Sequence, residues 1–196
     1  EMTSSLVGSE MCIRDSSYSD WADYDNFSPD ITVEGSDSKL LPAYLSLIRL
    51  SDSAIQNLVS YFEAQEEPTI IVFFGDHQPA DSVVRPVWKL NGKDDADLTD
   101  EEEALRYKVP FFIWANFDIE TENDLEISAN YLAAKTLDAA GLPKSAYDNF
   151  LSQLRTEVPV ISANHVTLSD GTFTTASKQK DLLYDYQTLQ YYLLFD

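Results

Sequence analysis

An aspartate and a histidine lie side by side at the end of the most apolar run in the chain. Residues 70–74, Ile-Ile-Val-Phe-Phe, are followed directly by Gly75, Asp76 and His77. Five consecutive β-branched or aromatic residues predict a strand that is buried on both faces. Ligands bind at the carboxyl ends of strands in an open α/β sheet, and a carboxylate oxygen with an imidazole nitrogen suits a divalent metal ion. The pair is therefore the first candidate for chemistry, in a chain with only two histidines.

The usefulness of this pair depends on the strand ending at Gly75. Adjacent residues of a continuing strand point to opposite faces, whereas a loop can turn both side chains toward one ion. A glycine allows the backbone to turn sharply there, and Gln78-Pro79 favours a non-helical exit. The alternative interpretation is that Asp76 and His77 only form a turn and a cap.

Further polar residues follow the pair closely. Asp81, Ser82 and Arg85 could line the same cleft as substrate-binding residues, and a guanidinium suits a phosphate oxygen. A long polar loop over residues 78–98 explains them equally well. The second histidine, His165, has small polar neighbours and is interpreted as structural.

Seven carboxylates cluster between residues 94 and 103. Their spacing lacks the alternating ligands, central glycine and closing glutamate of a calcium loop. Thr99 and Glu102 instead fit a capping box, with acids favoured in the first helical turn. We therefore predict a helix start here and no metal site.

The elements that must position these residues alternate between helices and strands, which indicates an α/β fold. Apolar periodicity and capping signals predict helices over residues 38–65, 127–140, 145–155 and 181–195, strands over 70–74, 109–115 and 158–161, and a hairpin tip at 169–172.

Composition bounds the possible partners. The 196 residues carry a formal charge of −21, which argues against nucleic acid, because phosphate binding needs clustered Lys and Arg. An anionic membrane surface is disfavoured for the same reason. The sequence has no run of about 18 apolar residues, as a membrane-spanning helix requires, and its single cysteine excludes an internal disulfide.

The Gly-Asp-His-Gln-Pro element at residues 75–79 also carries a resemblance. In this order with six other blocks, it resembles the lipoteichoic acid synthase family, phosphoglycerol transferases of the sulfatase/alkaline-phosphatase superfamily. The other blocks are Tyr44–Ile48, Asp52–Ile55, Tyr107–Trp114, Leu137–Pro143, Glu157–Ile161 and Asp185–Tyr191. The resemblance implies the C-terminal portion of an alkaline-phosphatase/sulfatase-like sandwich, with a mixed central sheet flanked by helices.

The resemblance also divides the chain. It covers residues 18–196, which we expect to be the C-terminal part of a single sulfatase-like catalytic domain. Residues 1–17 contain SSLVGSEMCIRDSS, which closely resembles a translated sequencing adapter. We therefore expect residues 1–17 to be a non-native leader.

By the same resemblance, Asp76 and His77 are two ligands of a catalytic divalent ion, Mn²⁺ or Mg²⁺. The threonine nucleophile and a glutamate ligand of the family lie upstream and have no counterpart here, so no catalytic residue is identified in this chain. The resemblance implies a metal-dependent phosphoglycerol transferase that makes or modifies a cell-envelope glycerophosphate polymer, present as a fragment that is inactive by itself.

Its expected substrate is a glycerophospholipid or a glycerophosphate polymer. The full-length parent is expected at the extracytoplasmic face of the cell membrane, held there only through N-terminal helices absent from this chain. Two alternatives stay open: a sulfatase or phosphatase-type hydrolase of the same superfamily, and a non-enzymatic interaction domain.

Overall fold

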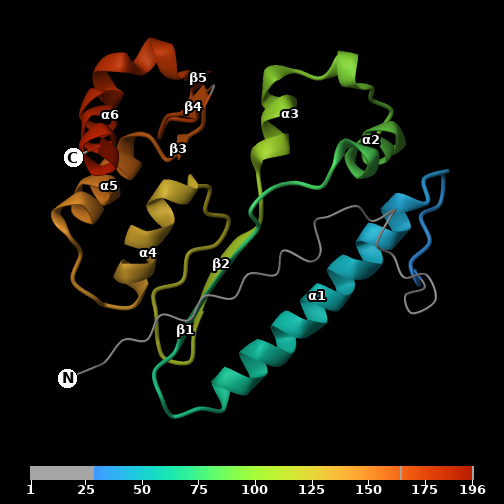
Figure 1. The fold of residues 1–196 in the computed structure, drawn as a ribbon, viewed down its shortest axis with the longest axis horizontal. Coiled ribbons are helices and arrows are strands. Elements are labelled where there is room, and N and C mark those ends of the chain that lie inside the picture. Colours follow the sequence, from blue (N-terminus) through green and yellow to red (C-terminus); the bar gives the residue numbers. More distant parts are fainter. Residues whose placement is uncertain (1–28, 164, 196) are drawn as a thin grey trace. The chain divides into compact units, whose positions relative to one another are not determined.

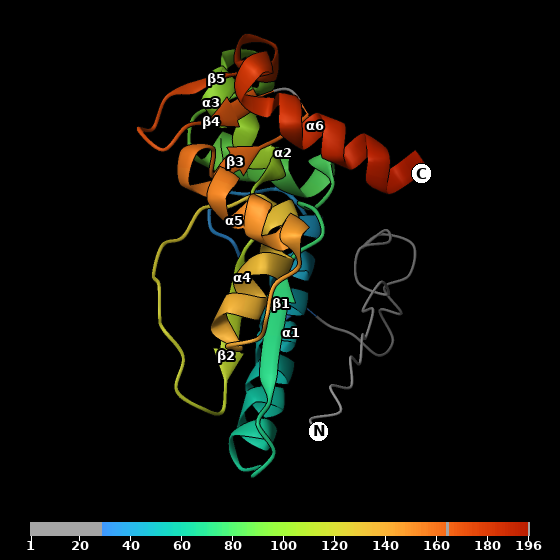
Figure 2. The same cartoon turned by 90° about the vertical axis from the view of Figure 1, so that its left-hand side faces the viewer.

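The computed structural model describes residues 29–163 and 165–195. They form two compact units. Unit 1 comprises the described residues up to 66 together with 74–111, and unit 2 comprises residues 67–73 together with those from 112 onward. Figures 1 and 2 show the order of the elements from two directions. The expected leader at residues 1–17 lies outside the described residues.

Unit 1 contains the long helix α1, Leu40–Glu63, which confirms the predicted amphipathic helix. Its buried face includes Leu41 and Ser46. The Ser46 hydroxyl donates to the Pro42 carbonyl at 2.8 Å and accepts from the Asp30 N–H at 3.2 Å. A buried hydroxyl therefore ties the chain before the helix to the helix itself.

The segment after the Asp-His pair is a helix that the sequence reading missed. Helix α2 covers Asp81–Leu90 with Pro86 inside it, where a loop was expected, and it buries Val83. Apolar residues 83, 84, 87 and 88 already share one helical face in the sequence. The internal proline, which lacks an N–H for the helical ladder, hid that pattern.

The acidic run forms short helices. The 3₁₀ turns η2 (Asp95–Asp97) and η3 (Leu105–Tyr107) flank α3 (Asp100–Ala104). Both hydrogen bonds of the Thr99–Glu102 capping box are present, so the predicted helix start is confirmed.

Strands β1 (Ile70–Phe74) and β2 (Phe111–Ala115) form a two-stranded sheet. The Asn116 N–H donates to the Thr69 carbonyl at 3.1 Å. The rings of Phe73 and Phe112 stack with centroids 5.3 Å apart. Both strands lie where they were predicted, and β2 begins directly after Pro110, which has no N–H to give to a ladder. The prediction that β1 is buried on both faces is wrong for the described residues: residues 70–73 are only partly buried and Phe74 is exposed, because the sheet here has two strands.

A second sheet lies within unit 2. Strands β3 (Val160–Ile161), β4 (His165–Thr167) and β5 (Phe173–Thr175) pair antiparallel in that order. The turn between β4 and β5 contains Gly171 at φ +83°, which confirms the predicted hairpin tip.

The helices of unit 2 are α4 (Leu132–Ala139), preceded by the 3₁₀ turn η4 (Ala129–Tyr131), α5 (Ala146–Glu157), and α6 (Lys180–Phe195), preceded by the 3₁₀ turn η5 (Ala176–Gln179). Together with β4, these helices enclose the main hydrophobic core. The buried residues of this core are Tyr131, Ala134, Leu151, Leu154, Val158, Val166, Leu183 and Tyr186.

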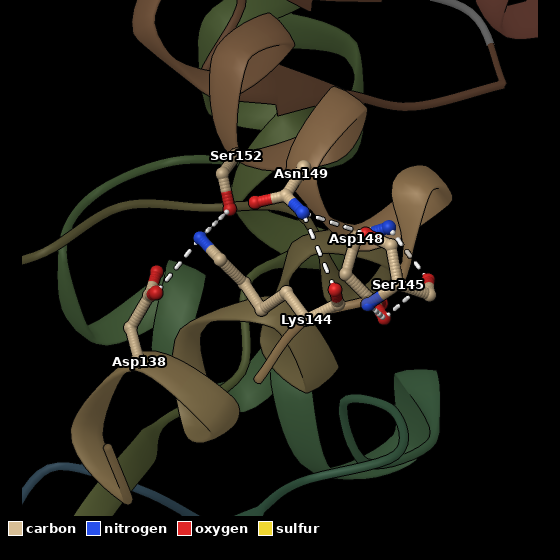
Figure 3. Close-up of polar contacts among 6 residues, drawn as sticks. All are labelled: Asp138, Lys144, Ser145, Asp148, Asn149 and Ser152. Carbon is tan, nitrogen blue, oxygen red and sulfur yellow. Dashed lines mark hydrogen bonds and ion pairs between the residues drawn. The ribbon is translucent and has the colours of Figure 1, made fainter. Parts of the chain in front are cut away.

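The turn from α4 to α5 is held by local polar contacts. Gly141 has φ +64° and its N–H donates to the Asp138 carbonyl at 3.1 Å, as expected for a glycine that ends a helix. The Lys144 ammonium lies 2.7 Å from both a carboxylate oxygen of Asp138 and the hydroxyl of Ser152 (Figure 3). One lysine thus links the end of α4 to α5, while Ser145 caps the start of α5.

Helices and small sheets alternate along the described chain, so the α/β fold class is confirmed. The described strands lie in two separate sheets of two and three strands. Within the described residues, no helix combines the length and the apolar composition needed to cross a membrane.

Candidate metal centre

The candidate pair belongs to unit 1 and follows the end of β1. The Gly75 N–H donates to the Pro110 carbonyl at 3.0 Å. A β-carbon built on Gly75 would lie 3.0 Å from the β-carbon of Val109, closer than carbon atoms pack. Gly75 is not among the glycines with positive φ, so the close approach of Val109, and not an unusual backbone turn, favours a glycine here.

Asp76 and His77 expose their side chains together. The His77 N–H donates to Asp76 Oδ1 at 2.9 Å, and Asp76 Oδ2 lies 3.6 Å from His77 Nε2. The two side chains are 68% and 54% exposed. The strand has ended at this point, so neighbouring residues present an oxygen and a nitrogen to the same side, as the sequence reading required.

The histidine ring is oriented by its neighbour. His77 Nδ1 lies 2.9 Å from the Gln78 carbonyl oxygen. A carbonyl only accepts, so Nδ1 donates to it, and in the neutral imidazole this leaves the lone pair on Nε2. This backbone contact is of the kind that fixes the tautomer of metal-binding histidines.

The donor set fits a divalent ion. Carboxylate oxygens and imidazole nitrogens bind such ions at about 2.0–2.2 Å. The 3.6 Å between Asp76 Oδ2 and His77 Nε2 is shorter than two such bonds together, so both atoms can reach one ion. Among residues 29–163 and 165–195, no group of three or more metal-binding side chains comes together. The pair therefore supplies two ligands.

Asp81, Ser82 and Arg85 occupy the first turns of α2, and all three are exposed. Asp81 binds Arg106 at 2.7 Å and Arg85 at 3.4 Å. The hydrogen bond and charge of the Arg106 guanidinium hold the pKa of the Asp81 carboxyl below its usual range. Arg85 also lies 2.8 Å from Asp95, so its guanidinium already contacts two carboxylates, and its role toward a phosphate stays a prediction.

Arg106 is the residue of this region that sequence reasoning missed. It comes from η3, and its guanidinium lies over the ring of Trp88 at 5.5 Å. Its Nε is buried and has no hydrogen-bond partner within the described structure. No local pattern points to Arg106, because its partners lie on α2.

The other sequence candidates lie elsewhere. His165 is in β4 of unit 2, where its ring packs against Phe173 with centroids 4.6 Å apart. In the acidic run, Glu102 forms an ion pair with Lys93. These placements agree with the structural interpretation of both features.

The comparisons with known proteins give one family and one curated relative. The sequence model of a family described as Sulfatase matches residues 14–142, more than half of the chain. The relative is the "Putative cyclic beta-1,2-glucan modification protein" of Rhizobium meliloti (strain 1021), 24% identical over 176 residues. These residues are 84% of this chain and 27% of the relative, so the chain spans about a quarter of its length. No solved structure matches the chain.

Proposed function

The chain belongs to the sulfatase family, and from this premise we propose that it is part of a metal-dependent phosphoglycerol transferase of the lipoteichoic acid synthase type. Asp76 and His77 are the proposed ligands of Mn²⁺ or Mg²⁺. The observation that carries the proposal is their joint exposure directly after β1, within the residues that match the family.

The surroundings support a ligand role over a simple turn. The Gln78 carbonyl accepts from His77 Nδ1, so in the neutral imidazole the lone pair lies on Nε2, 3.6 Å from Asp76 Oδ2. Val109 closes on Gly75 and limits the movement of the strand end. A site held in this way is pre-organised, which metal binding requires.

The proposed chemistry divides between the ion and the protein. A bound divalent ion lowers the pKa of a nucleophilic hydroxyl and neutralises charge on a phosphoryl group. Asp76 contributes a negative charge to the site, and His77 contributes a neutral nitrogen whose orientation Gln78 fixes. The nucleophile is proposed to lie outside the residues of this chain.

The substrate and location are proposals as well. We propose a glycerophospholipid or a glycerophosphate polymer as substrate, at the extracytoplasmic face of the cell membrane in the parent protein. The printed name of the relative, a "Putative cyclic beta-1,2-glucan modification protein", supports a glucan as an acceptor.

A hydrolase is the second candidate, because the matching family is described as Sulfatase. The two candidates differ in the acceptor, which is water for a hydrolase and an alcohol for a transferase. Incubation of the chain and of its parent protein with Mn²⁺ and either a glycerophospholipid or an aryl sulfate separates them. Sulfate release favours the hydrolase, whereas transfer of glycerophosphate to an alcohol favours the transferase.

Metal binding tests the site directly. Titration of the chain with Mn²⁺ by calorimetry should give a saturable signal. His77→Ala and Asp76→Asn should each weaken the affinity by about tenfold or more, since even residues that only orient a ligand contribute about 10- to 100-fold.

Two matched controls isolate the pair. His165→Ala removes the other histidine, and Asp52→Asn removes an exposed aspartate of α1. Both variants should bind Mn²⁺ like the unaltered chain. If Asp76→Asn and His77→Ala bind as these controls do, the pair is not a metal site and the third alternative, a non-enzymatic domain, gains support.

A further inference from the structure

A cavity of about 290 Å³ lies within unit 1, beside the candidate metal pair. Gln78 and Pro79, which follow His77 in the chain, form one wall. Residues of α1, α2 and η3 form the rest. The full lining is Leu41, Tyr44, Leu45, Gln78, Pro79, Val83, Val84, Val87, Trp88, Leu105 and Arg106.

The walls suit a hydrocarbon. Leucine, valine and proline side chains supply seven of the eleven lining residues. These seven side chains offer no hydrogen bonds to the many hydroxyls of a sugar, and only Tyr44, Gln78, Trp88 and Arg106 carry polar side-chain atoms. A cavity of about 150 Å³ lined by apolar residues binds benzene. A cavity about twice that size has room for an aliphatic chain of roughly eight carbons.

One polar group on the wall lacks a partner. Arg106 lines the cavity, and its Nε is buried without a hydrogen-bond partner in the described structure. An unpaired buried donor costs free energy, which an acceptor oxygen on a ligand would recover. The amide of Gln78, in contrast, already donates to the Lys108 carbonyl.

The charges around the cavity favour a neutral acceptor. Asp81 lies 2.7 Å from the Arg106 guanidinium and balances its charge. The formal charge of −21 on the whole chain opposes a further anion. An ester carbonyl therefore fits Arg106 better than a carboxylate does.

We propose that this cavity binds the acyl chain of a neutral acyl ester, with its carbonyl oxygen accepting a hydrogen bond from Arg106 Nε. Gln78 directly follows His77, and adjacent Cα atoms are about 3.8 Å apart. The same proposal places the alcohol end of the bound ester at the wall formed by Gln78, on the side of Asp76 and His77. This link to the metal pair rests on the proposed function, whereas binding in the cavity does not.

The test uses glycerol monobutanoate, monohexanoate and monooctanoate, each below its micelle concentration, titrated into the chain in EDTA. The affinity should rise about fourfold for each added methylene, from about 0.8 kcal/mol per buried methylene. Octanoate, which has the same chain with a carboxylate, should bind more weakly than its glycerol ester. Equal affinities along the series, or saturable binding of a glucose disaccharide in place of the esters, would overturn the proposal.

Variants of α2 locate the binding. Val84→Phe fills the cavity and should abolish the dependence on chain length. Leu90→Phe is the matched control, because Leu90 lies on the same helix outside the lining and is exposed. Val87→Asp places a charge at the exposed rim and should weaken binding without altering the core. If Val87→Asp and Val84→Phe both bind the octanoyl ester normally, the cavity is not the site.

The role of Arg106 has its own control. Arg106→Leu removes the donor and should weaken ester binding about threefold to tenfold. Asp81→Asn removes the same ion pair but keeps Nε, and should leave ester binding within about twofold. Equal losses in both variants would show that only the ion pair matters and would overturn the assigned hydrogen bond.

The cavity and the metal pair can fail separately. Ester binding in EDTA and in His77→Ala is expected to equal that of the unaltered chain. Loss of Mn²⁺ binding with normal ester binding contradicts only the metal proposal, and the reverse contradicts only the cavity proposal.

Discussion

Replacing Gly75 by alanine should disturb the candidate metal pair without touching either ligand. The added methyl group would lie 3.0 Å from Val109 Cβ and 3.4 Å from Val109 Cγ1. Carbon atoms pack at about 3.5–4.0 Å, so Val109 and the end of β1 must separate by about half an ångström. We expect the end of β1 to share in this movement, and Asp76 and His77 follow it directly.

The expected cost combines two opposing effects. Crowding at a packed position destabilises by roughly 1–3 kcal/mol. Alanine also restricts the unfolded chain, which stabilises by about 0.4–1 kcal/mol where the backbone is compatible, as it is at Gly75. The net loss should be about 0.5–2 kcal/mol. Functional sites must be held within about 0.5 Å, so the Mn²⁺ affinity should fall by about tenfold.

Thermal melts and Mn²⁺ calorimetry on the same variants measure both effects. Gly92→Ala is the control, because Gly92 has φ +70° and nothing within 4 Å of an added β-carbon. That variant should lose about 1 kcal/mol of stability through backbone strain but keep its Mn²⁺ affinity. Combining Gly75→Ala with Val109→Gly removes the clash and should restore much of the binding. A Gly75→Ala variant that melts and binds Mn²⁺ normally would refute the reasoning.

Three further predictions concern unit 2. Burial raises the pKa of Tyr131 far above its usual range. As the pH rises, the unfolded chain therefore loses the phenol proton before the folded chain does. The contribution of Tyr131 to the free energy of unfolding is fully present below pH 10 and should fall as the pH rises beyond about 10. Thermal melts at pH 9 and pH 11 should show this drop in stability. Tyr131→Phe should reduce the drop, and it should cost about 1–2 kcal/mol at pH 7 because the 2.8 Å hydrogen bond to the Val158 carbonyl is lost. An unchanged drop in this variant would contradict the role of Tyr131. Ser145→Ala should cost about 1 kcal/mol by removing the cap of α5, which denaturant unfolding can detect, and no change would show that the cap is redundant. Lys144→Met should cost about 1 kcal/mol and speed hydrogen exchange at the α4–α5 turn, whereas unchanged exchange would indicate that the turn is held by Gly141 alone.

The sequence alone determined the features whose causes lie within a few residues. The apolar run of β1 ends at Gly75 as predicted, and the apolar period of α1 gave its bounds to within two residues. The capping box at Thr99 and the glycine end of α4 were also predicted correctly. In each case a residue interacts with its own neighbours along the chain, so the pattern is visible in the linear order.

The same logic explains the missed helix. Helix α2 forms although Pro86 lies within it. Val83 is almost fully buried, so burial of the apolar face compensates for the hydrogen bond that a proline cannot make. Whether burial outweighs the lost hydrogen bond depends on how α2 packs against other elements. The sequence shows the proline but not that packing.

Only the tertiary structure decided what surrounds the candidate site. Val109 lies close to Gly75, and Arg106 forms an ion pair with Asp81. In both pairs the two residues are more than twenty positions apart in the sequence. The sequence suggested that Gly75 serves a backbone turn, whereas the structure shows a close approach of Val109 to it. The second contact shows that Arg106 belongs to the surroundings of the candidate metal pair. Such pairs form because the fold brings distant segments together, and no spacing in a single sequence records them. The sequence thus determined which residues can bind a metal ion, and the fold decided how they are held.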